Sequence, residues 1–212
     1  MTDAVLQAKS LSKDFDRRKI FSALSFSVSS GSALAITGRN GTGKSTLAKI
    51  LCGVLTPTSG AAILSCTGTV VPPERLHRHV GLVSPYVQMY DEFSGIENLR
   101  IMLSIRGMKH QPEERFRSLL RQFGIDDRRD DDVRTYSSGM KQRLKYAAAL
   151  LHEPELLVLD EPTSNLDEQG IGAVREAMVE QKKRGILIIA TNDRDDLAYA
   201  DQIVTVEGGT RE

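Results

Sequence analysis

The residues best suited to chemistry form a glycine-rich stretch between an apolar segment and an expected helix. The stretch GRNGTGKST, residues 38–46, follows the apolar segment ALAIT and fits the pattern G-x-x-x-x-G-K-[ST]. Its glycines let several backbone N–H groups face one anion, and the following helix adds the partial positive charge of its N-terminus. The pattern therefore predicts a phosphate-binding loop, with a glycine-rich turn that holds a chance lysine as the alternative.

The side chains of this loop have different expected roles. Lys44 is expected to reach the β- and γ-phosphates of a nucleotide, Ser45 to bind Mg²⁺, and Thr46 to contribute N–H and hydroxyl contacts. The residues expected to contact the nucleotide are Gly38, Asn40, Gly41, Gly43, Lys44, Ser45 and Thr46.

Two adjacent carboxylates end a second apolar segment, in the stretch ELLVLDEPTSNLD at residues 155–167. Asp160, at the end of an expected buried strand, is positioned to hold Mg²⁺ through water. Glu161 is free to accept a proton from an attacking water molecule. A solvated turn is the other interpretation of two such carboxylates, and the phosphate loop argues against it.

A third apolar run, in the stretch GILIIATNDRDD at residues 185–196, ends in a polar tip that contains Asn192. A continuous apolar run bounded by glycine and polar residues is typical of a central strand in a parallel sheet. Ligands of such sheets lie beyond the carboxyl ends of the strands. The polar tip with Asn192 is therefore where a ligand is expected, near Lys44 and Glu161.

The composition excludes several classes of protein. Lys plus Arg and Asp plus Glu are 28 each among 212 residues, so the balanced charge does not indicate a nucleic-acid partner. No apolar run approaches the roughly 20 residues of a membrane span, and no signal peptide is expected at the N-terminus. The two cysteines, Cys52 and Cys66, are not in metal-ligand spacing, which indicates a reduced, cytoplasmic setting. His77 and His79 are expected on a solvated polar face, because no acidic or thiol partner is near them in the sequence.

Apolar periodicity predicts an α/β fold with a parallel central sheet flanked by helices. Strands are expected at 5–11, 25–28, 33–37, 61–64, 80–84, 156–159, 186–190 and 203–206. Helices are expected at 45–51, 94–107, 112–124, 138–151, 168–183 and 194–200. The first two strands alternate as an exposed antiparallel layer does, and the helices between 94 and 151 indicate an inserted helical lobe.

Local patterns within the lobe support this division. Ser94 and Glu97 have the spacing of a capping box at the start of the first lobe helix. The second helix carries an apolar stripe that is expected in the core, formed by Phe116, Leu119, Leu120 and Phe123. The charge-rich run GIDDRRDDDV, residues 124–133, is expected to be a solvated loop.

Four motifs, GRNGTGKST, YSSGMKQR, LLVLDEPTSNLD and IIATND, follow one another along the chain. In this order and spacing they resemble the ATP-binding subunit of an ABC transporter, over almost the whole chain. The resemblance implies a P-loop NTPase of ABC type, with an N-terminal antiparallel β layer. It implies one domain, 1–212, in which 1–84 and 154–212 form the nucleotide-binding core and about 85–153 the helical lobe with the signature motif. It also implies two ATP molecules with Mg²⁺, sandwiched between this domain and a second ABC ATPase chain.

The resemblance also assigns roles to residues outside the phosphate loop. Ser137, Ser138 and Gly139 begin an Ala-rich helix and are expected to contact the γ-phosphate of ATP held by the second chain. An ordinary helix cap is the alternative for these three residues. Phe15 resembles the aromatic residue that stacks on adenine, and Asp167 resembles the residue that couples the two ATP sites.

Two positions depart from the family pattern. The glutamine that usually follows the strand at 80–84 is replaced by Pro85, which has no side-chain donor or acceptor, and Gln88 lies three residues later. Either Gln88 reaches the Mg²⁺ site through a reshaped loop, or the contact is lost. Asn192 stands where the family usually has histidine, so a hydrogen bond to the γ-phosphate can survive but a cation cannot form. Because Glu161 is present, slow hydrolysis is expected.

The leading hypothesis is a cytoplasmic ATPase, peripheral at the inner face of the cell membrane, that drives a separate integral membrane permease. Tyr86, Met89, Tyr90 and Phe93 are expected either to dock that permease or to complete the core of the lobe. One alternative is a subunit that binds ATP structurally while a partner hydrolyses it. Another is a soluble ABC ATPase that acts on nucleic acid or ribosomes, which the neutral charge opposes. The compact chain is also similar to the ATPase subunits of cytochrome c maturation haem exporters.

Overall fold

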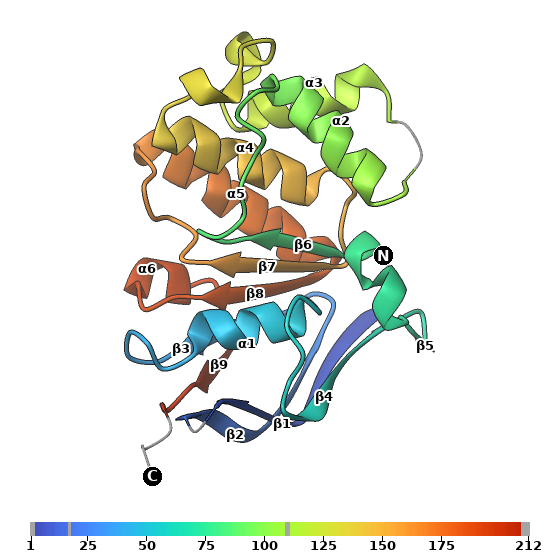
Figure 1. The fold of residues 1–212 in the computed structure, drawn as a ribbon, viewed down its shortest axis with the longest axis vertical. Coiled ribbons are helices and arrows are strands. Elements are labelled where there is room, and N and C mark those ends of the chain that lie inside the picture. Colours follow the sequence, from blue (N-terminus) through green and yellow to red (C-terminus); the bar gives the residue numbers. More distant parts are fainter. Residues whose placement is uncertain (1–2, 17, 109–110, 209–212) are drawn as a thin grey trace.

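The computed structural model describes residues 3–16, 18–108 and 111–208, which form two β-sheets and the helices that cover them (Figure 1). The antiparallel sheet has the order β2-β1-β4-β5 and contains β1 (Ala4–Phe15), β2 (Arg18–Ser29), β4 (Ser59–Cys66) and β5 (Thr69–Val70). The parallel sheet has the order β6-β7-β8-β3-β9 and contains β3 (Ala33–Thr37), β6 (Val80–Val83), β7 (Leu156–Asp160), β8 (Ile186–Ala190) and β9 (Gln202–Thr205).

The helices lie mainly around the parallel sheet. The α-helices are α1 (Lys44–Leu51), α2 (Gly95–Ile105), α3 (Glu113–Gln122), α4 (Ser138–Leu150), α5 (Glu168–Arg184) and α6 (Arg194–Leu197). Short 3-10 helices are η1 (Pro73–Arg78), η2 (Asp126–Arg128) and η3 (Val133–Thr135). Within the described residues, no helix has the length and apolar character needed to cross a membrane.

The parallel sheet lies between two hydrophobic cores. Every residue of β7 and β8 is buried. Along β8, Leu187 and Ile189 pack with the lobe, whereas Ile186 and Ile188 pack with α1 and the antiparallel sheet. Helices α4 and α5 lie on one side of the sheet and α1 on the other (Figure 1). Because both faces are removed from water, these strands are apolar without alternation, as the sequence predicted.

The helical lobe is built as its sequence patterns predict. Ser94 Oγ accepts a hydrogen bond from Glu97 N, and Glu97 Oε2 accepts one from Ser94 N, so the predicted capping box is confirmed. The predicted apolar stripe on α3 is also confirmed as core, since Phe116, Leu119, Leu120 and Phe123 are all buried. Phe123 also stacks on Tyr146 of α4, with ring centroids 5.5 Å apart.

The structure differs from the sequence prediction where chain pairing, not local pattern, decides the conformation. Strands β1 and β2 each run for 12 residues, longer than predicted, because antiparallel pairing continues through polar residues beyond the apolar alternation. Strand β5 and the 3-10 helices were not predicted. The run 124–133 is only partly a solvated loop, since Ile125 and Val133 are buried and Asp126 pairs with Arg117.

Candidate functional site

The phosphate loop joins β3 to α1. Two of its glycines have backbone conformations in which any other residue would be strained. Gly38 has φ +144°, and a Cβ there would lie 2.4 Å from Val206 O. Gly43, the N-cap of α1, has φ +112°, and a Cβ there would lie 2.3 Å from Ile20 Cγ2. Glycine is therefore required at both positions to close the loop over the helix N-terminus.

A cavity of about 320 Å³ opens over this loop. Its lining includes Asn40, Gly41, Gly43, Lys44, Ser45 and Thr46 from the predicted set, together with Glu161. The Lys44 side chain is buried at the cavity, where Nζ donates to Gly38 O at 2.9 Å and lies 3.5 Å from Asn40 Oδ1. The loop thus places the Lys44 ammonium group beside its own backbone, an arrangement suited to phosphate binding.

Asp160 lies at the end of β7, where two hydroxyl groups donate to its carboxylate. Ser45 Oγ donates to Oδ1 at 3.0 Å, and Ser84 Oγ donates to Oδ2 at 3.3 Å. Burial raises the pKa of Asp160, and the two hydroxyl groups act in the opposite direction. A buried carboxylate beside a serine hydroxyl is a set of hard oxygen donors, which fits Mg²⁺.

Glu161 follows Asp160 and turns its side chain toward the cavity through an uncommon backbone conformation. Its φ is +52°, in the left-handed region that a non-glycine residue seldom occupies. The Glu161 N–H donates to Ala190 O at 2.9 Å, which ties this turn to the end of β8. Burial raises the pKa of Glu161, while Lys44 lowers it. A carboxylate with a raised pKa beside a cationic lysine is a suitable general base.

Asn192, just beyond β8, contacts the phosphate loop through both ends of its amide. Its Oδ1 accepts from Gly38 N at 3.3 Å, and its Nδ2 donates to Asn40 Oδ1 at 3.4 Å. Asn40 therefore stands between Asn192 and Lys44. The structure brings these three polar side chains together although they come from two distant parts of the sequence.

Other predicted site residues lie outside this cavity. Phe15 is 44% exposed, with Lys13 Nζ 4.7 Å from its ring centroid. Gln88 and Pro85 are exposed, and neither belongs to the lining. Their predicted contributions, a contact from Gln88 and a stacking surface from Phe15, stay predictions.

The signature residues lie at the exposed start of α4. Ser137 is the N-cap of α4, and its side chain accepts from Met140 N at 3.2 Å. Ser138 is exposed and Gly139 half-buried. The cap that the alternative interpretation describes is therefore present at Ser137, next to an exposed Ser138.

Asp167 has partners within its own chain. It is the N-cap of α5, accepts from Gly170 N at 2.9 Å and forms an ion pair with Arg143 of α4. The Gly170 N–H, followed by Arg143, lowers the pKa of the Asp167 carboxyl. These contacts fasten α5 to the helix that begins with the signature residues.

The sequence interpretation missed three residues of this site. Ile20 and Tyr86 line the cavity, and Ser84 contacts Asp160. The centroid of the Tyr86 ring also lies 3.7 Å from Lys49 Nζ on α1. This cation–π contact holds Tyr86, which is 68% exposed, against the phosphate-loop helix. Only the position of Ser84 and Tyr86 directly after β6 could have indicated them, since that is where a parallel sheet places ligands.

Replacing Ser84 with Ala is expected to raise the Mg²⁺ concentration for half-maximal ATP hydrolysis by about 10-fold, with kcat at saturating Mg²⁺ little changed. The substitution removes one of two hydrogen bonds to the Asp160 carboxylate, and such a bond to a charged group contributes about 1.5–3 kcal/mol. The measurement is ATPase rate against free Mg²⁺. Ser84→Thr, which keeps the hydroxyl, should restore the parent value; an unchanged Mg²⁺ requirement in Ser84→Ala would contradict the role of Ser84.

Comparison with known proteins places the chain in a family. The model of the family described as ABC transporter matches residues 21–164. The linearmycin resistance ATP-binding protein LnrL of Bacillus subtilis is 31% identical over 191 residues, 89% of this chain, and the chain spans 61% of that protein's length. The lantibiotic transport ATP-binding protein SrtF of Streptococcus pyogenes is 32% identical over 89% of this chain and 80% of its own length.

A solved structure agrees in fold and in sequence. The structure of an ATP-binding subunit of an ABC transporter superposes with a TM-score of 0.85 at 32% identity, over 97% of this chain and 87% of its own. The predicted α/β fold of ABC type is confirmed by this likeness. With a cavity at the predicted phosphate loop, this chain belongs to the ABC transporter family, and the relatives that it matches are ATP-binding proteins.

Proposed function

We propose that this chain binds ATP with Mg²⁺ and hydrolyses it as a single ATPase domain that drives a separate membrane permease. The proposal rests on Lys44, Ser45 and Glu161, which line one cavity, and on Asp160, which accepts a hydrogen bond from Ser45. These residues follow β3 and β7, whose carboxyl ends share one edge of the parallel sheet. The arrangement supplies a cation, Mg²⁺ ligands and a base around the position of the γ-phosphate.

The proposed mechanism assigns one task to each group. Lys44 and the N–H groups of the loop bind the phosphates, and Ser45 and Asp160 would hold Mg²⁺. When bound, Mg²⁺ neutralises the charge that develops on the phosphate oxygens. Glu161 accepts the proton of the attacking water, and its raised pKa makes it a stronger base than an exposed glutamate. Asn192 donates to the γ-phosphate after exchanging its present contacts with the loop.

The proposal includes a second ABC ATPase chain. At the start of α4, Ser137 and Ser138 are exposed and Gly139 is half-buried, and all three lie outside the cavity of their own chain. Its hydroxyl and N–H groups suit the γ-phosphate of ATP held by the second chain. A steady-state test is ATPase rate against chain concentration, with Glu161→Gln as the blank. A rate that rises faster than linearly supports a self-associating ATPase, whereas a rate equal to the blank despite ATP binding opposes it.

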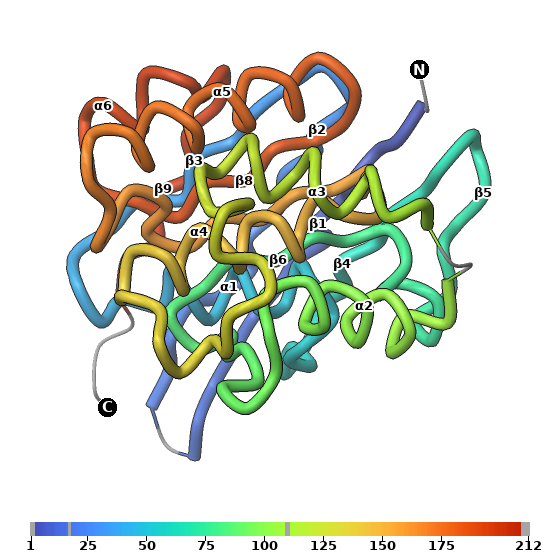
Figure 2. Tube along the Cα trace, turned by 90° about the horizontal axis from the view of Figure 1, so that it is seen from above, coloured from blue at the N-terminus to red at the C-terminus, as the bar shows by residue number. Residues whose placement is uncertain are grey.

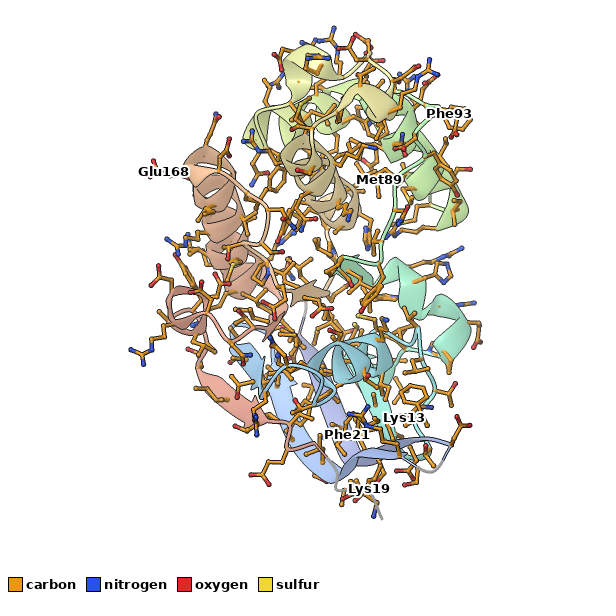
Figure 3. The ribbon with its side chains drawn as sticks, turned by 60° about the vertical axis from the view of Figure 1, so that its left-hand side comes forward. Lys13, Lys19, Phe21, Met89, Phe93 and Glu168 are labelled. Carbon is orange, nitrogen blue, oxygen red and sulfur yellow. The ribbon has the colours of Figure 1, made fainter. Side chains whose placement is uncertain are left out.

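The permease is proposed to dock beside α1 and α2, which places this chain at the cytoplasmic face of a membrane. A second cavity of about 400 Å³ has mainly apolar walls, with Val54 and Ile105 65% and 62% exposed at its rim. Tyr86, Tyr90 and Phe93 are exposed, and Figure 3 shows Phe93 projecting from the lobe. Met89 instead packs against the lobe core. The three aromatic residues therefore suit the docking interpretation, and Met89 suits the core interpretation.

A hydrolysis-impaired subunit is the second candidate function, favoured by Pro85 and Asn192. Pro85 offers no side-chain contact, and Asn192 offers a neutral one. Under this alternative, ATP held at the cavity has a structural role and the second chain hydrolyses its own ATP.

Replacing Asn192 with His is expected to raise kcat about 5-fold, because a charge-assisted hydrogen bond to the γ-phosphate is stronger than a neutral one. Single-turnover ATP hydrolysis at saturating Mg²⁺ measures this change. Asn192→Ala, which loses the contacts to Gly38 and Asn40, should be slower than the parent. A turnover in Asn192→His that is unchanged or lower would count against the assigned role.

A further inference from the structure

Three side chains of the kinds that bind transition metals meet at a place remote from the nucleotide cavity. His79 Nδ1 lies 3.1 Å from Glu155 Oε2 and 3.9 Å from Cys66 Sγ, and the three ligand atoms are all within 4.8 Å of one another. Cys66 is 9% exposed, and the side chains of His79 and Glu155 are 30% and 21% exposed. The expectation that His79 lies on a solvated polar face is therefore wrong, because its side chain is only 30% exposed and has an acidic and a thiol partner in space. Both partners come from elsewhere in the chain.

Strand ends from both sheets position this cluster. Cys66 ends β4 of the antiparallel sheet, His79 directly precedes β6, and Glu155 directly precedes β7. Leu156 N donates to His79 O at 3.0 Å, which holds the entries of β6 and β7 side by side. The phosphate-loop cavity lies at the opposite, carboxyl ends of β6 and β7, since Tyr86 and Glu161 line it. In Figures 1 and 2, β5 and the end of β4 lie on one side of the molecule and α6 on the other.

We propose that Cys66, His79 and Glu155 bind a divalent cation of the Zn²⁺ kind through Sγ, Nδ1 and one carboxylate oxygen, with water as the fourth ligand. Thiolate, imidazole and carboxylate are the ligands that Zn²⁺ prefers. Bonds of about 2.0–2.3 Å at tetrahedral angles place ligand atoms roughly 3.3–3.6 Å apart. The separations of His79 Nδ1 from Glu155 Oε2 and Cys66 Sγ, 3.1 and 3.9 Å, differ from that range by a few tenths of an ångström, and the third pair, Cys66 and Glu155, lies within 4.8 Å.

The bound cation balances the charges of its site. A Cys66 thiolate and a Glu155 carboxylate carry two negative charges, and a divalent cation neutralises both. Without the cation, burial and then the Glu155 carboxylate raise the pKa of Cys66 to about 11, so the thiol keeps its proton. Coordination deprotonates a bound cysteine and releases that proton to the solvent.

The simpler interpretation of the cluster is a hydrogen bond between His79 and Glu155, with the thiol as a bystander. The two interpretations differ in the chemical state of the Cys66 sulfur. A metal site has a metal–thiolate bond that joins the antiparallel sheet to the parallel one, whereas a His79–Glu155 pair leaves Cys66 a free thiol. A cation that bridges both sheets should also raise the unfolding temperature, because it binds the folded chain and not the unfolded one.

The test is titration of the full chain with Co²⁺, a spectroscopic substitute for Zn²⁺, in millimolar Mg²⁺ and without nucleotide. The expected result is one equivalent bound, with a near-ultraviolet thiolate-to-cobalt charge-transfer band and d–d bands of tetrahedral intensity that added Zn²⁺ abolishes. Cys66→Ser should lose the charge-transfer band, and His79→Gln and Glu155→Gln should each weaken binding at least about 10-fold. Absence of the band from the parent chain at stoichiometric Co²⁺ would overturn the proposal.

The chain supplies a matched control for two of the three ligands. Cys52 is the other free cysteine, and His77 is two residues from His79 but outside the cluster. Cys52→Ser and His77→Gln should both keep the band and the rise in unfolding temperature with Zn²⁺. A band that survives in Cys66→Ser, or that disappears equally in Cys52→Ser, would show that cobalt binds elsewhere and would overturn the site. Because these readouts do not involve ATP hydrolysis, they are independent of the proposed function.

Discussion

Replacing Glu161 with Gln is expected to lower kcat for ATP hydrolysis by about 10²–10⁴-fold while ATP binding is retained. The amide has nearly the shape of the carboxylate but cannot accept the proton of the attacking water. Lys44 and the loop N–H groups, which bind the phosphates, are left in place. Removal of a negative charge beside Lys44 should, if anything, tighten the binding of the anionic nucleotide. Single-turnover hydrolysis and calorimetric titration with ATP measure the two effects separately.

Glu168 offers a matched control for this substitution. It is a glutamate seven residues later, exposed in the first turn of α5, and Figure 3 shows it pointing away from the body of the molecule. Glu168→Gln should retain the parent kcat and the parent affinity for ATP. If Glu161→Gln hydrolysed ATP within about 3-fold of Glu168→Gln, the general base would have to be another group, and the chemistry proposed for this cavity would fail.

Much of the site was predictable because its residues follow apolar strands. β3 and β8 have the bounds that the sequence predicted, since each is an uninterrupted apolar run between polar or glycine residues. The rules for parallel sheets place the ends of such strands together, so the proximity of Ser45 to Asp160 followed from two separate motifs. The phosphate-loop glycines were predictable for the same local reason, because their backbone conformations are encoded residue by residue.

The residues that the sequence interpretation missed depend on pairing between distant segments. Ser84 reaches Asp160 only because β6 lies directly beside β7, and its position directly after an apolar strand does not by itself identify that partner. The sulfur of Cys66 lies within 4.8 Å of the Glu155 carboxylate because β4 of one sheet ends near the entry of β7 in the other. Such contacts depend on how the two sheets pack, which periodicity within one segment does not determine.

Asp160→Asn is expected to lower ATP hydrolysis by at least about 100-fold while the nucleotide-free chain becomes no less stable than the parent. The loss follows from Mg²⁺, because an amide is a weaker and uncharged ligand for a metal that contributes several kcal/mol to phosphoryl transfer. The retained stability follows from the hydrogen bonds. The Asn oxygen can accept from one serine hydroxyl, and its amide can donate to the other, so both contacts of Asp160 have a replacement.

The sign of the pH dependence supports this expectation. Burial raises the pKa of Asp160 above the 3.8 expected for the unfolded chain, so folding favours the protonated form. The ionised carboxylate therefore lowers the free energy of unfolding. The whole of this loss is present at a pH above the raised pKa of the folded chain, and none of it well below 3.8. The difference in unfolding temperature between Asp160→Asn and the parent should accordingly be largest at neutral pH and shrink as the pH falls toward 3.8. Thermal unfolding without nucleotide or Mg²⁺, at several pH values, measures it.

Asp196 provides the comparison that separates stability from function. It too is a buried carboxylate with a raised pKa, and it accepts from Thr163 Oγ1 at 3.1 Å and Thr191 Oγ1 at 3.4 Å. Asp196→Asn should show the same pH-dependent change in unfolding temperature but keep the Mg²⁺ dependence of ATP binding. If Asp160→Asn retained the Mg²⁺ dependence of the parent, Asp160 would be a structural carboxylate like Asp196. A metal-binding role predicts a buried charge that weakens the fold and is required only with Mg²⁺, because a bound cation would supply the positive charge that offsets the burial of the carboxylate.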